Sequence, residues 1–158
     1  MKFIAILLTS LISYSAMAQQ AVVDIHLKPA GSFKVKSTDV KGVVEQKGDH
    51  IEAHNIVVGL AKVETGIAMR DEHTRKHLEV DKFPTATLIS ATGKGGKGEG
   101  TIKIKGIEHK ISGTYKIDGG KCIATFPLQL SDYKIEGIKY MGVGVADDVS
   151  ITVTVPVK

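Results

Sequence analysis

Two pairs of histidines have a spacing that could bind a metal ion. His73 and His77 are four residues apart in a stretch with the pattern of a helix, so both imidazoles would lie on one helix face. Structural zinc needs four protein ligands and catalytic zinc needs three and a water molecule, and spacing marks no third ligand here. His50 and His54 fall on an expected strand, which separates them by about 13 Å. We therefore predict no metal site and interpret these histidines as exposed residues.

The sequence lacks the motifs of nucleophilic catalysis. It contains no G-x-S-x-G elbow, and its one cysteine, Cys122, has no histidine partner marked by spacing. Asp132 and the pair Asp147-Asp148 could supply carboxylates, but acids in turns beside strands are common and no catalytic pair stands out. We therefore predict no enzymatic activity and no cofactor.

Residues 93–98 match the G-x-G-x-x-G pattern of dinucleotide-binding proteins. In those proteins a helix follows the glycines, so that its N-terminus can bind a pyrophosphate. Here apolar and polar residues alternate over residues 101–105, which is typical of a strand. We therefore expect a glycine-rich hairpin loop at 93–98 rather than a nucleotide site.

The first 18 residues have the pattern of a secretory signal peptide. Lys2 gives a basic start, residues 3–12 are largely apolar, and Ala16-Met17-Ala18 form an A-x-A cleavage pattern. An apolar run of about ten residues is too short for a membrane helix, which needs roughly 20. We predict cleavage after Ala18 and a single domain over residues 19–158. The product is expected in the periplasm, and secretion beyond an outer membrane stays open.

Composition limits the classes of partner. The chain has 158 residues, a formal net charge of +4 at pH 7, and lysines spread along its length. It has no tryptophan and few other aromatic residues to stack on bases, and export removes nucleic acid as a partner. The dispersed positive charge fits transient contact with an acidic membrane surface, and a homodimer stays open. A single cysteine cannot form an internal disulfide, so we expect a buried Cys122 and a fold stabilised by packing.

One helix must position part of any site. Residues 65–78 give the one clear helix signal, with acid-then-base pairs four residues apart. Few of these residues are apolar, so we expect a lid that touches a core along one edge and otherwise faces water. Arg70-Asp71 is the most distinctive polar pair. It is either an ion pair or cap that fixes the helix, or a device that sets the lid over a cavity mouth.

Segments of alternating apolar and polar residues fill the rest of the chain. They give about eight or nine strands joined by short turns, with no helix-sized crossover between them. Short connections disfavour parallel βαβ units and favour an antiparallel sandwich or a closed barrel. We predict an all-β fold, an antiparallel β-barrel of about eight strands with one short inserted helix.

The interior of such a barrel is either filled by side chains or able to hold one small ligand. Alternation along each expected strand assigns the residues that face inward, although a shift of one residue would invert the assignment. Residues beneath the lid are added to this set. The candidate ligand-binding residues are Phe33, Met69, Leu78, Leu88, Ile102, Ile104, Ile111, Tyr115, Phe126, Leu128 and Met141.

The chain resembles the YceI-like family of exported bacterial proteins from about Val22 to Val155. The resemblance is carried by Val63-Glu64-Thr65-Gly66, Arg70-Asp71-Glu72-His73 and Lys82-Phe83-Pro84-Thr85-Ala86-Thr87, and later by Leu130-Ser131-Asp132-Tyr133 and Asp147-Asp148-Val149. It implies a lipocalin-like antiparallel barrel with a long apolar interior. It also implies an isoprenoid ligand, such as a polyprenyl lipid or a quinone tail, and no catalysis.

These observations lead to two hypotheses of function. The first is a periplasmic binding or carrier protein that holds an isoprenoid or a similar long apolar chain in the barrel interior. The alternative is a filled β-barrel that acts as a structural or protein-interaction domain in an envelope stress response, without a ligand.

Overall fold

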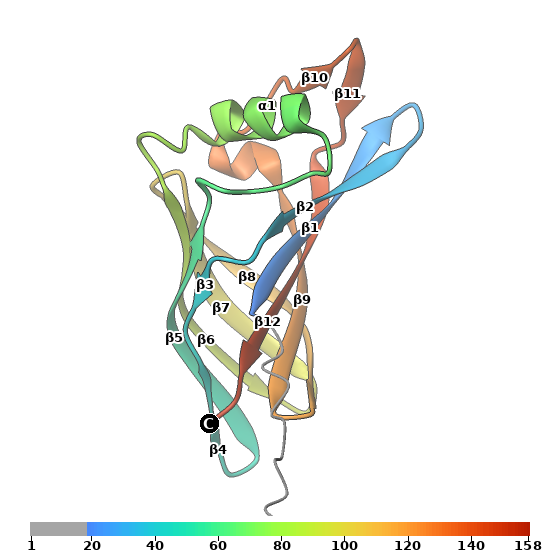
Figure 1. Cartoon of the computed structure of the whole chain (residues 1–158). Coiled ribbons are helices and arrows are strands. Elements are labelled where there is room, and N and C mark those ends of the chain that lie inside the picture. The colour runs from blue at the N-terminus through green and yellow to red at the C-terminus, as the bar shows by residue number, and fades with distance from the viewer. Residues whose placement is uncertain (1–18) are drawn as a thin grey trace, which may run out of the picture.

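The computed structural model describes residues 19–158, and the predicted signal peptide at 1–18 lies outside the described residues. Figure 1 shows one α-helix crossing the end of a tall β-barrel. No helix among residues 19–158 is long and apolar enough to span a membrane. In chain order the elements are β1 (Gln20–Lys28), β2 (Ser32–Ser37), β3 (Val40–Lys41), β4 (Val44–Lys47), β5 (His50–Gly59), α1 (Ala68–Leu78), β6 (Thr85–Lys94), β7 (Lys97–Ile104), β8 (Ile107–Asp118), β9 (Lys121–Gln129), the 3₁₀ helix η1 (Leu130–Tyr133), β10 (Lys139–Tyr140), β11 (Val143–Val145) and β12 (Asp148–Pro156).

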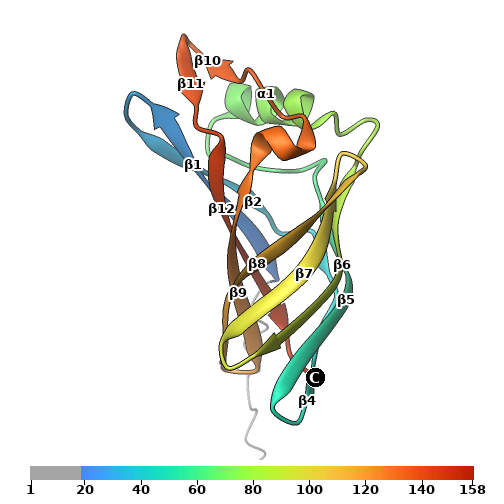
Figure 2. The same ribbon diagram turned by 180° about the vertical axis from the view of Figure 1, so that it is seen from behind.

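The strands form a nearly closed antiparallel barrel, as the alternating pattern predicts. Hydrogen-bonded neighbours follow the order β10-β11-β1-β12-β9-β8-β7-β6-β5-β3, while β2 pairs with β1 and β4 pairs with β5. Residues 32–47 contain β2, β3 and β4, so this one segment joins β1 to β5. Figure 2, the view from behind, shows β6, β7, β8 and β9 side by side in the wall of the barrel that faces the viewer there. Closure pairs strands that would otherwise expose unpaired backbone groups at an edge.

The predicted number of strands, about eight, is too low, because the described chain has twelve. The sequence predicts two strands in residues 32–47, but this segment breaks into three as it passes from β1 to β5. At the crossing Gly42 has φ +139°, and a Cβ there would lie 2.8 Å from Cγ1 of Ile56, so only glycine fits. Residues 134–145 contain the short hairpin of β10 and β11, which adds two further strands.

Helix α1 begins at Ala68, three residues after the predicted start at Thr65, and Thr65 itself lies outside the helix and bonds to it. Oδ1 of Asp71 accepts hydrogen bonds from the backbone N–H of Thr65 at 2.6 Å and from its hydroxyl at 2.5 Å. These donors lower the pKa of Asp71. The spacing of Asp71 and Arg75 predicts an ion pair, but none is present between these two residues in the described structure. Glu72 and Lys76, at the same spacing, do pair at 3.6 Å. The interpretation of Asp71 as a residue that fixes the helix is therefore confirmed.

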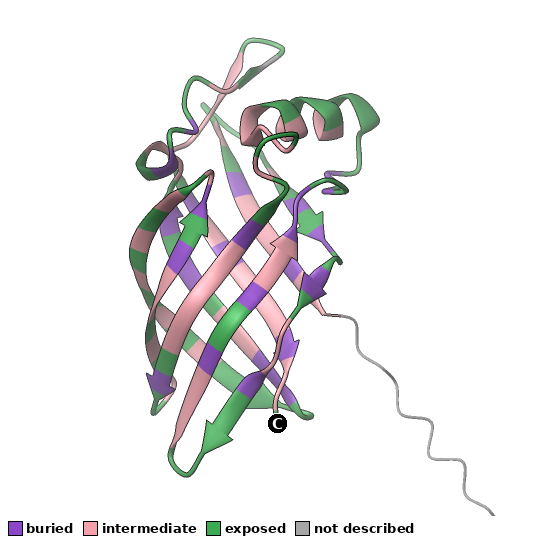
Figure 3. Ribbon diagram, turned by 90° about the vertical axis from the view of Figure 1, so that its left-hand side faces the viewer, coloured by how far each residue is buried: buried purple, intermediate pink, exposed green. Residues whose placement is uncertain are grey.

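Buried and exposed residues alternate along the barrel strands (Figure 3). The exposure of β8 changes at every residue from Ile107 to Lys116, as the period-two pattern predicts. The buried apolar residues form two clusters, one nearer α1 and one that includes Cys122 and Val155. Cys122 is 2% exposed, which confirms its predicted burial, and desolvation raises the pKa of its thiol.

The glycine-rich run at 93–98 forms a hairpin, as expected, but its loop is shorter than predicted. Strand β6 runs on through Gly93 to Lys94, and β7 resumes at Lys97. Only Gly95 and Gly96 form the turn, and both have positive φ. The remaining glycines of this run are therefore part of the barrel wall.

Candidate functional site

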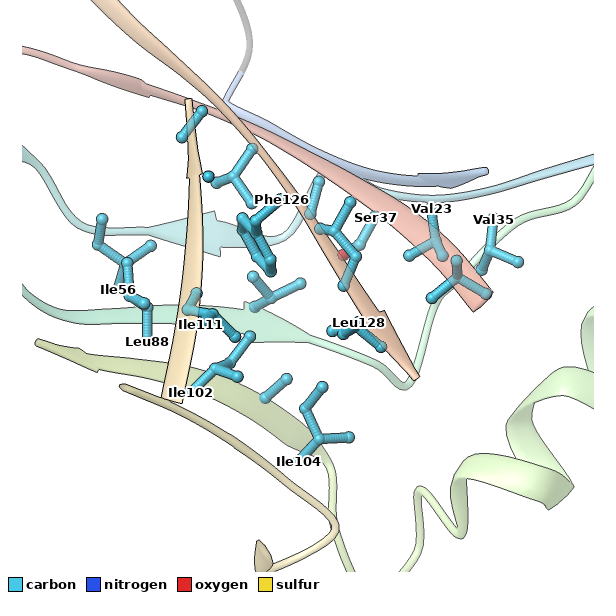
Figure 4. Close-up of a pocket in the computed structure, with 18 of the residues that line it drawn as sticks. Val23, Val35, Ser37, Ile56, Leu88, Ile102, Ile104, Ile111, Phe126 and Leu128 are labelled. Carbon is cyan, nitrogen blue, oxygen red and sulfur yellow. The ribbon is translucent and has the colours of Figure 1, made fainter. Parts of the chain in front are cut away.

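A cavity occupies the interior of the barrel below α1. Its volume is about 250 Å³, counted as the space that the centres of water molecules could occupy. Since each water needs roughly 10–15 Å³ on this measure, the cavity has room for on the order of 20 water-sized groups. Its lining is mostly apolar. In Figure 4, Ile56, Ile104, Phe126 and Val23 extend from different strands towards this common space.

Most of the candidate residues lie where the alternation places them. Each of these inward positions sits on a strand except Leu78, which is the last residue of α1. The structure brings them together around one cavity, although their contact with a ligand stays a prediction. The candidate residues that line the cavity are Phe33, Leu78, Leu88, Ile102, Ile104, Ile111, Tyr115, Phe126 and Leu128.

Met69 and Met141 were wrongly assigned to the interior. Met69 is 68% exposed, because the side of α1 that faces the cavity carries residues 70, 73, 74 and 77 and position 69 points away from it. Met141 is 86% exposed, at the turn that joins β10 to β11, where its φ is +50°. Ile67, just before the helix, is 47% exposed.

Tyr115 lies over the glycine-containing part of the wall. In the register, Gly93 of β6 pairs with Gly98 of β7, and Gly98 pairs with Gly113 of β8. A Cβ on Gly93 would lie 2.5 Å from Cε1 of Tyr115, so the aromatic ring occupies the space that a side chain there would need. Glycine in this wall is therefore a packing requirement as well as a turn signal.

Apart from Tyr115 and Ser37, whose hydroxyl donates to the carbonyl of Gly59 at 2.6 Å, the polar residues of the lining fall into two groups. The first group consists of exposed residues that alternate with the inward glycines, so they lie at the cavity only because the wall is thin there. They are Thr92, Glu99, Ser112 and Thr114. The second group is the underside of the lid. Four residues at helical spacing form it, and this spacing was visible in the sequence but was interpreted as a solvated face. They are Arg70, His73, Thr74 and His77.

Arg70 is held in place from two sides. Its Nη2 donates a hydrogen bond to the backbone carbonyl of Thr65 at 2.7 Å, and its guanidinium carbon lies 4.1 Å from the centre of the Phe33 ring. This cation–π contact attaches α1 to β2. Of the two interpretations of Arg70, the structure therefore supports both, since the residue fixes the helix and lines the cavity under it.

The surroundings of His77, the last of these four lid residues, are positively charged. Burial lowers the pKa of His77, and electrostatic interaction with His73 and Lys105 lowers it further. Lys105 bonds Glu79 at 3.0 Å and donates to the carbonyl of Lys134 at 3.1 Å. Its ammonium group lowers the pKa of Glu79. Protonating His77 is therefore disfavoured while no anion lies beside it.

Two of the acids considered for catalysis, Asp147 and Asp148, have structural partners for their carboxylates, and Oδ1 of Asp148 accepts a hydrogen bond from Nε2 of Gln129 at 3.3 Å. Asp147 accepts hydrogen bonds from the backbone N–H and the hydroxyl of Ser131, at 2.7 and 2.6 Å, and these donors lower its pKa. The backbone carbonyl of Asp132 lies 2.9 Å from Nε2 of His109. In residues 19–158 no group of three or more His, Cys, Asp or Glu side chains is placed to hold a metal ion. The arrangement suits binding of an apolar molecule with a polar end.

Two solved structures share this architecture. The crystal structure of BcnA from Burkholderia cenocepacia is similar with a TM-score of 0.63, 16% sequence identity, and coverage of 85% of this chain and 94% of that chain. A polyisoprenoid binding domain from Saccharophagus degradans, implicated in plant cell wall breakdown, is similar with a TM-score of 0.61 and 14% identity. That alignment covers 89% of this chain and 93% of the other. At these identities the likeness establishes the fold.

Sequence comparison gives the family. No curated protein matches this chain significantly. The YceI-like domain matches residues 14–157, which is nearly the whole described barrel. The chain is therefore a member of the YceI-like domain family.

Proposed function

We propose that this protein is a periplasmic carrier that holds an isoprenoid or a similar long apolar chain inside its barrel. The apolar cavity under a polar lid is the observation that carries the proposal. A filled barrel, the alternative that the sequence leaves open, has no such space. The similar domain from Saccharophagus degradans, described as polyisoprenoid binding, adds support for the class of ligand.

The size of the cavity fits a chain-like molecule. Ten buried CH₂-sized groups would contribute about 8 kcal/mol at about 0.8 kcal/mol each. Association costs an estimated 4–15 kcal/mol, so useful affinity needs a longer chain or a second interaction. Space for on the order of 20 groups accommodates the longer chain. The polar lid offers the second interaction.

Exposed apolar side chains at the lid end support loading from a membrane surface. Four large apolar side chains are exposed in the described chain, and Ile67, Met69 and Met141 are three of them. All three belong to the end of the barrel where α1 and the β10–β11 hairpin lie (Figure 1). Transient contact of this end with lipid would place the mouth of the cavity where an apolar ligand is dissolved.

Native mass spectrometry tests the carrier function. The protein is purified from its native envelope without detergent, and its mass is measured before and after extraction with organic solvent. We expect a stoichiometric apolar molecule that the solvent releases. An empty protein that also refuses added polyprenols, polyprenyl phosphates, fatty acids and quinones would contradict the carrier function and favour the filled barrel. Fractionation with N-terminal sequencing tests the periplasmic location and the start at Gln19.

A further inference from the structure

The underside of α1 is chemically unlike the rest of the cavity. Arg70, His73, Thr74 and His77 lie at positions i, i+3, i+4 and i+7, which form one face of a helix, and all four line the cavity. No residue of α1 is buried, so the helix contributes little apolar packing. Elsewhere the lining is mostly apolar; its other inward polar side chains are Tyr115 and Ser37, whose hydroxyl donates to the carbonyl of Gly59 at 2.6 Å. Among the described lining residues, the α1 face therefore carries the one inward cation.

Arg70 has N–H donors beyond the one that bonds Thr65. A guanidinium has five N–H donors, and Nη2 of Arg70 gives one of them to the carbonyl of Thr65 at 2.7 Å. Its Nε is buried and has no hydrogen-bond partner among residues 19–158. A buried donor without an acceptor costs free energy, and the cost is larger on a charged group. Arg70 is therefore prepared to donate to an acceptor supplied from the cavity.

The orientation of Arg70 is fixed before any ligand binds. The ring of Phe33 lies against the guanidinium at 4.1 Å, and Thr65 is in turn held by the two hydrogen bonds to Asp71. These contacts limit the rotamers of a side chain that is otherwise flexible. A preorganised donor loses less entropy when it binds, which raises its contribution to affinity.

Charge at this face is predominantly positive. Arg70 is the only permanent cation among the described lining residues, and the one carboxylate among them, Glu99, is exposed on the outer side of β7. Near the lid, Lys105 adds a positive charge that lowers the pKa of His77, and the carboxylate of Glu79 is engaged by Lys105. Asp71 is engaged by Thr65. A bound anion would meet attraction from Arg70 without a free carboxylate beside it.

We infer that Arg70, with His73 and His77, forms a headgroup site for an oxyanion, a phosphate or carboxylate, at the end of an apolar chain. The inference rests on the proposed carrier function and specifies its ligand: an acidic lipid binds more tightly than an alcohol or a quinone of the same chain length. Charge-assisted hydrogen bonds to a guanidinium are roughly twice as strong as neutral ones. The apolar chain of the ligand supplies affinity, and the lid selects its headgroup.

Matched ligands test the selectivity in the wild-type protein. Residues 19–158 are titrated with geranylgeranyl phosphate, geranylgeraniol, palmitate and palmityl alcohol below their aggregation limits, and dissociation constants are measured by calorimetry. We expect each acid to bind about 10-fold to 100-fold more tightly than its alcohol. Tight binding of geranylgeranyl phosphate with weak binding of palmitate would assign the site to phosphate. Tight binding of palmitate with weak binding of geranylgeranyl phosphate would assign it to carboxylate.

Variants then locate the selectivity. Arg70→Gln should remove most of the preference for the acid, while Arg70→Lys should retain part of it because the charge remains. Arg75→Gln is the matched control, since it removes the same charge from the same helix and a contact with the carbonyl of Val63, but Arg75 does not line the cavity. It should leave the preference unchanged.

The pKa of His77 gives a further measurement that can be made on the wild-type protein. An oxyanion beside His77 would offset the desolvation and the positive charge that lower its pKa, so the NMR titration midpoint of His77 should rise with the phosphate and not with the alcohol. Equal affinity for acid and alcohol with an unmoved midpoint would overturn the headgroup site and leave the carrier function intact. Failure of all four ligands to bind would contradict the carrier function itself.

Discussion

The guanidinium carbon of Arg70 lies 4.1 Å from the centre of the Phe33 ring. Arg70 belongs to α1 and Phe33 to β2, so this contact joins the lid to the barrel wall. The same guanidinium bonds the carbonyl of Thr65 in the segment before the helix. One side chain therefore attaches the lid at two points while it lines the cavity.

We expect Phe33→Leu to loosen α1, because leucine is apolar but has no ring to attract the guanidinium. The free energy of unfolding should fall by about 0.5–2 kcal/mol, measured by denaturant titration. Hydrogen exchange of the α1 amides should become faster. A double-mutant cycle with Arg70→Gln separates the pair from simple loss of packing. Strictly additive losses would mean that the two side chains do not interact.

Ile104→Asp should abolish retention of an apolar ligand, because it places a carboxylate at a position that is 8% exposed and lines the cavity. Native mass spectrometry after incubation with lipid measures retention, and circular dichroism checks the fold. Lys103→Asp introduces the same group one residue earlier on the exposed side of β7 and should retain the lipid.

A milder change keeps this test decisive if Ile104→Asp does not fold. Ile104→Ala removes apolar contact without adding charge and should weaken lipid binding, with stability lowered by about 2–5 kcal/mol. A folded Ile104→Asp variant that still holds the lipid would show that Ile104 does not face the ligand.

Met69→Glu combined with Met141→Glu should reduce binding to vesicles that contain acidic lipid, because it adds charge to the exposed apolar surface at the lid end. Cosedimentation measures the bound fraction. Ile117→Glu is the control, since Ile117 is also exposed, at 41%, but lies near the β8–β9 turn at the other end. A similar loss in both proteins would indicate nonspecific adsorption rather than contact through the lid end.

Acid should weaken the attachment of the lid through Asp71. The Thr65 donors lower the pKa of this carboxyl in the folded state, so its stabilising contribution is present above the unfolded pKa of about 3.9 and is lost as the pH falls through the folded pKa. Thermal unfolding between about pH 6 and pH 3 should show a shallower decline for Asp71→Asn than for the wild type. Identical pH slopes for the two proteins would exclude this contribution.

Alternation was a sufficient guide to most of the barrel. Ile102, Ile104 and Ile111 lie inside because a pleated strand turns every second side chain to the same face. The division of residues 32–47 into three strands could not be predicted in this way, since it depends on contact between Gly42 and Ile56, two residues far apart in sequence. Tertiary packing, rather than local pattern, sets that break.

The lid was the harder part to predict. Hydrophobicity pointed to Met69 as the residue beneath it, but the cavity faces the polar side of α1, which carries Arg70 and His77. A helix docked by hydrogen bonds and one cation–π contact leaves no apolar stripe in the sequence. The spacing of residues 70, 73, 74 and 77 was the available signal, and it becomes informative only once the barrel below is known.

Strand β12 lies between β1 and β9, with Ile151 paired to Val23 on one side and to Phe126 on the other. The first and last strands of the described chain are thus neighbours, and the wall stays incomplete until residues 148–156 are available. Pairings over such sequence distances form slowly. Under the proposed carrier function, a ligand can therefore be enclosed only after β12 has paired with β1 and β9.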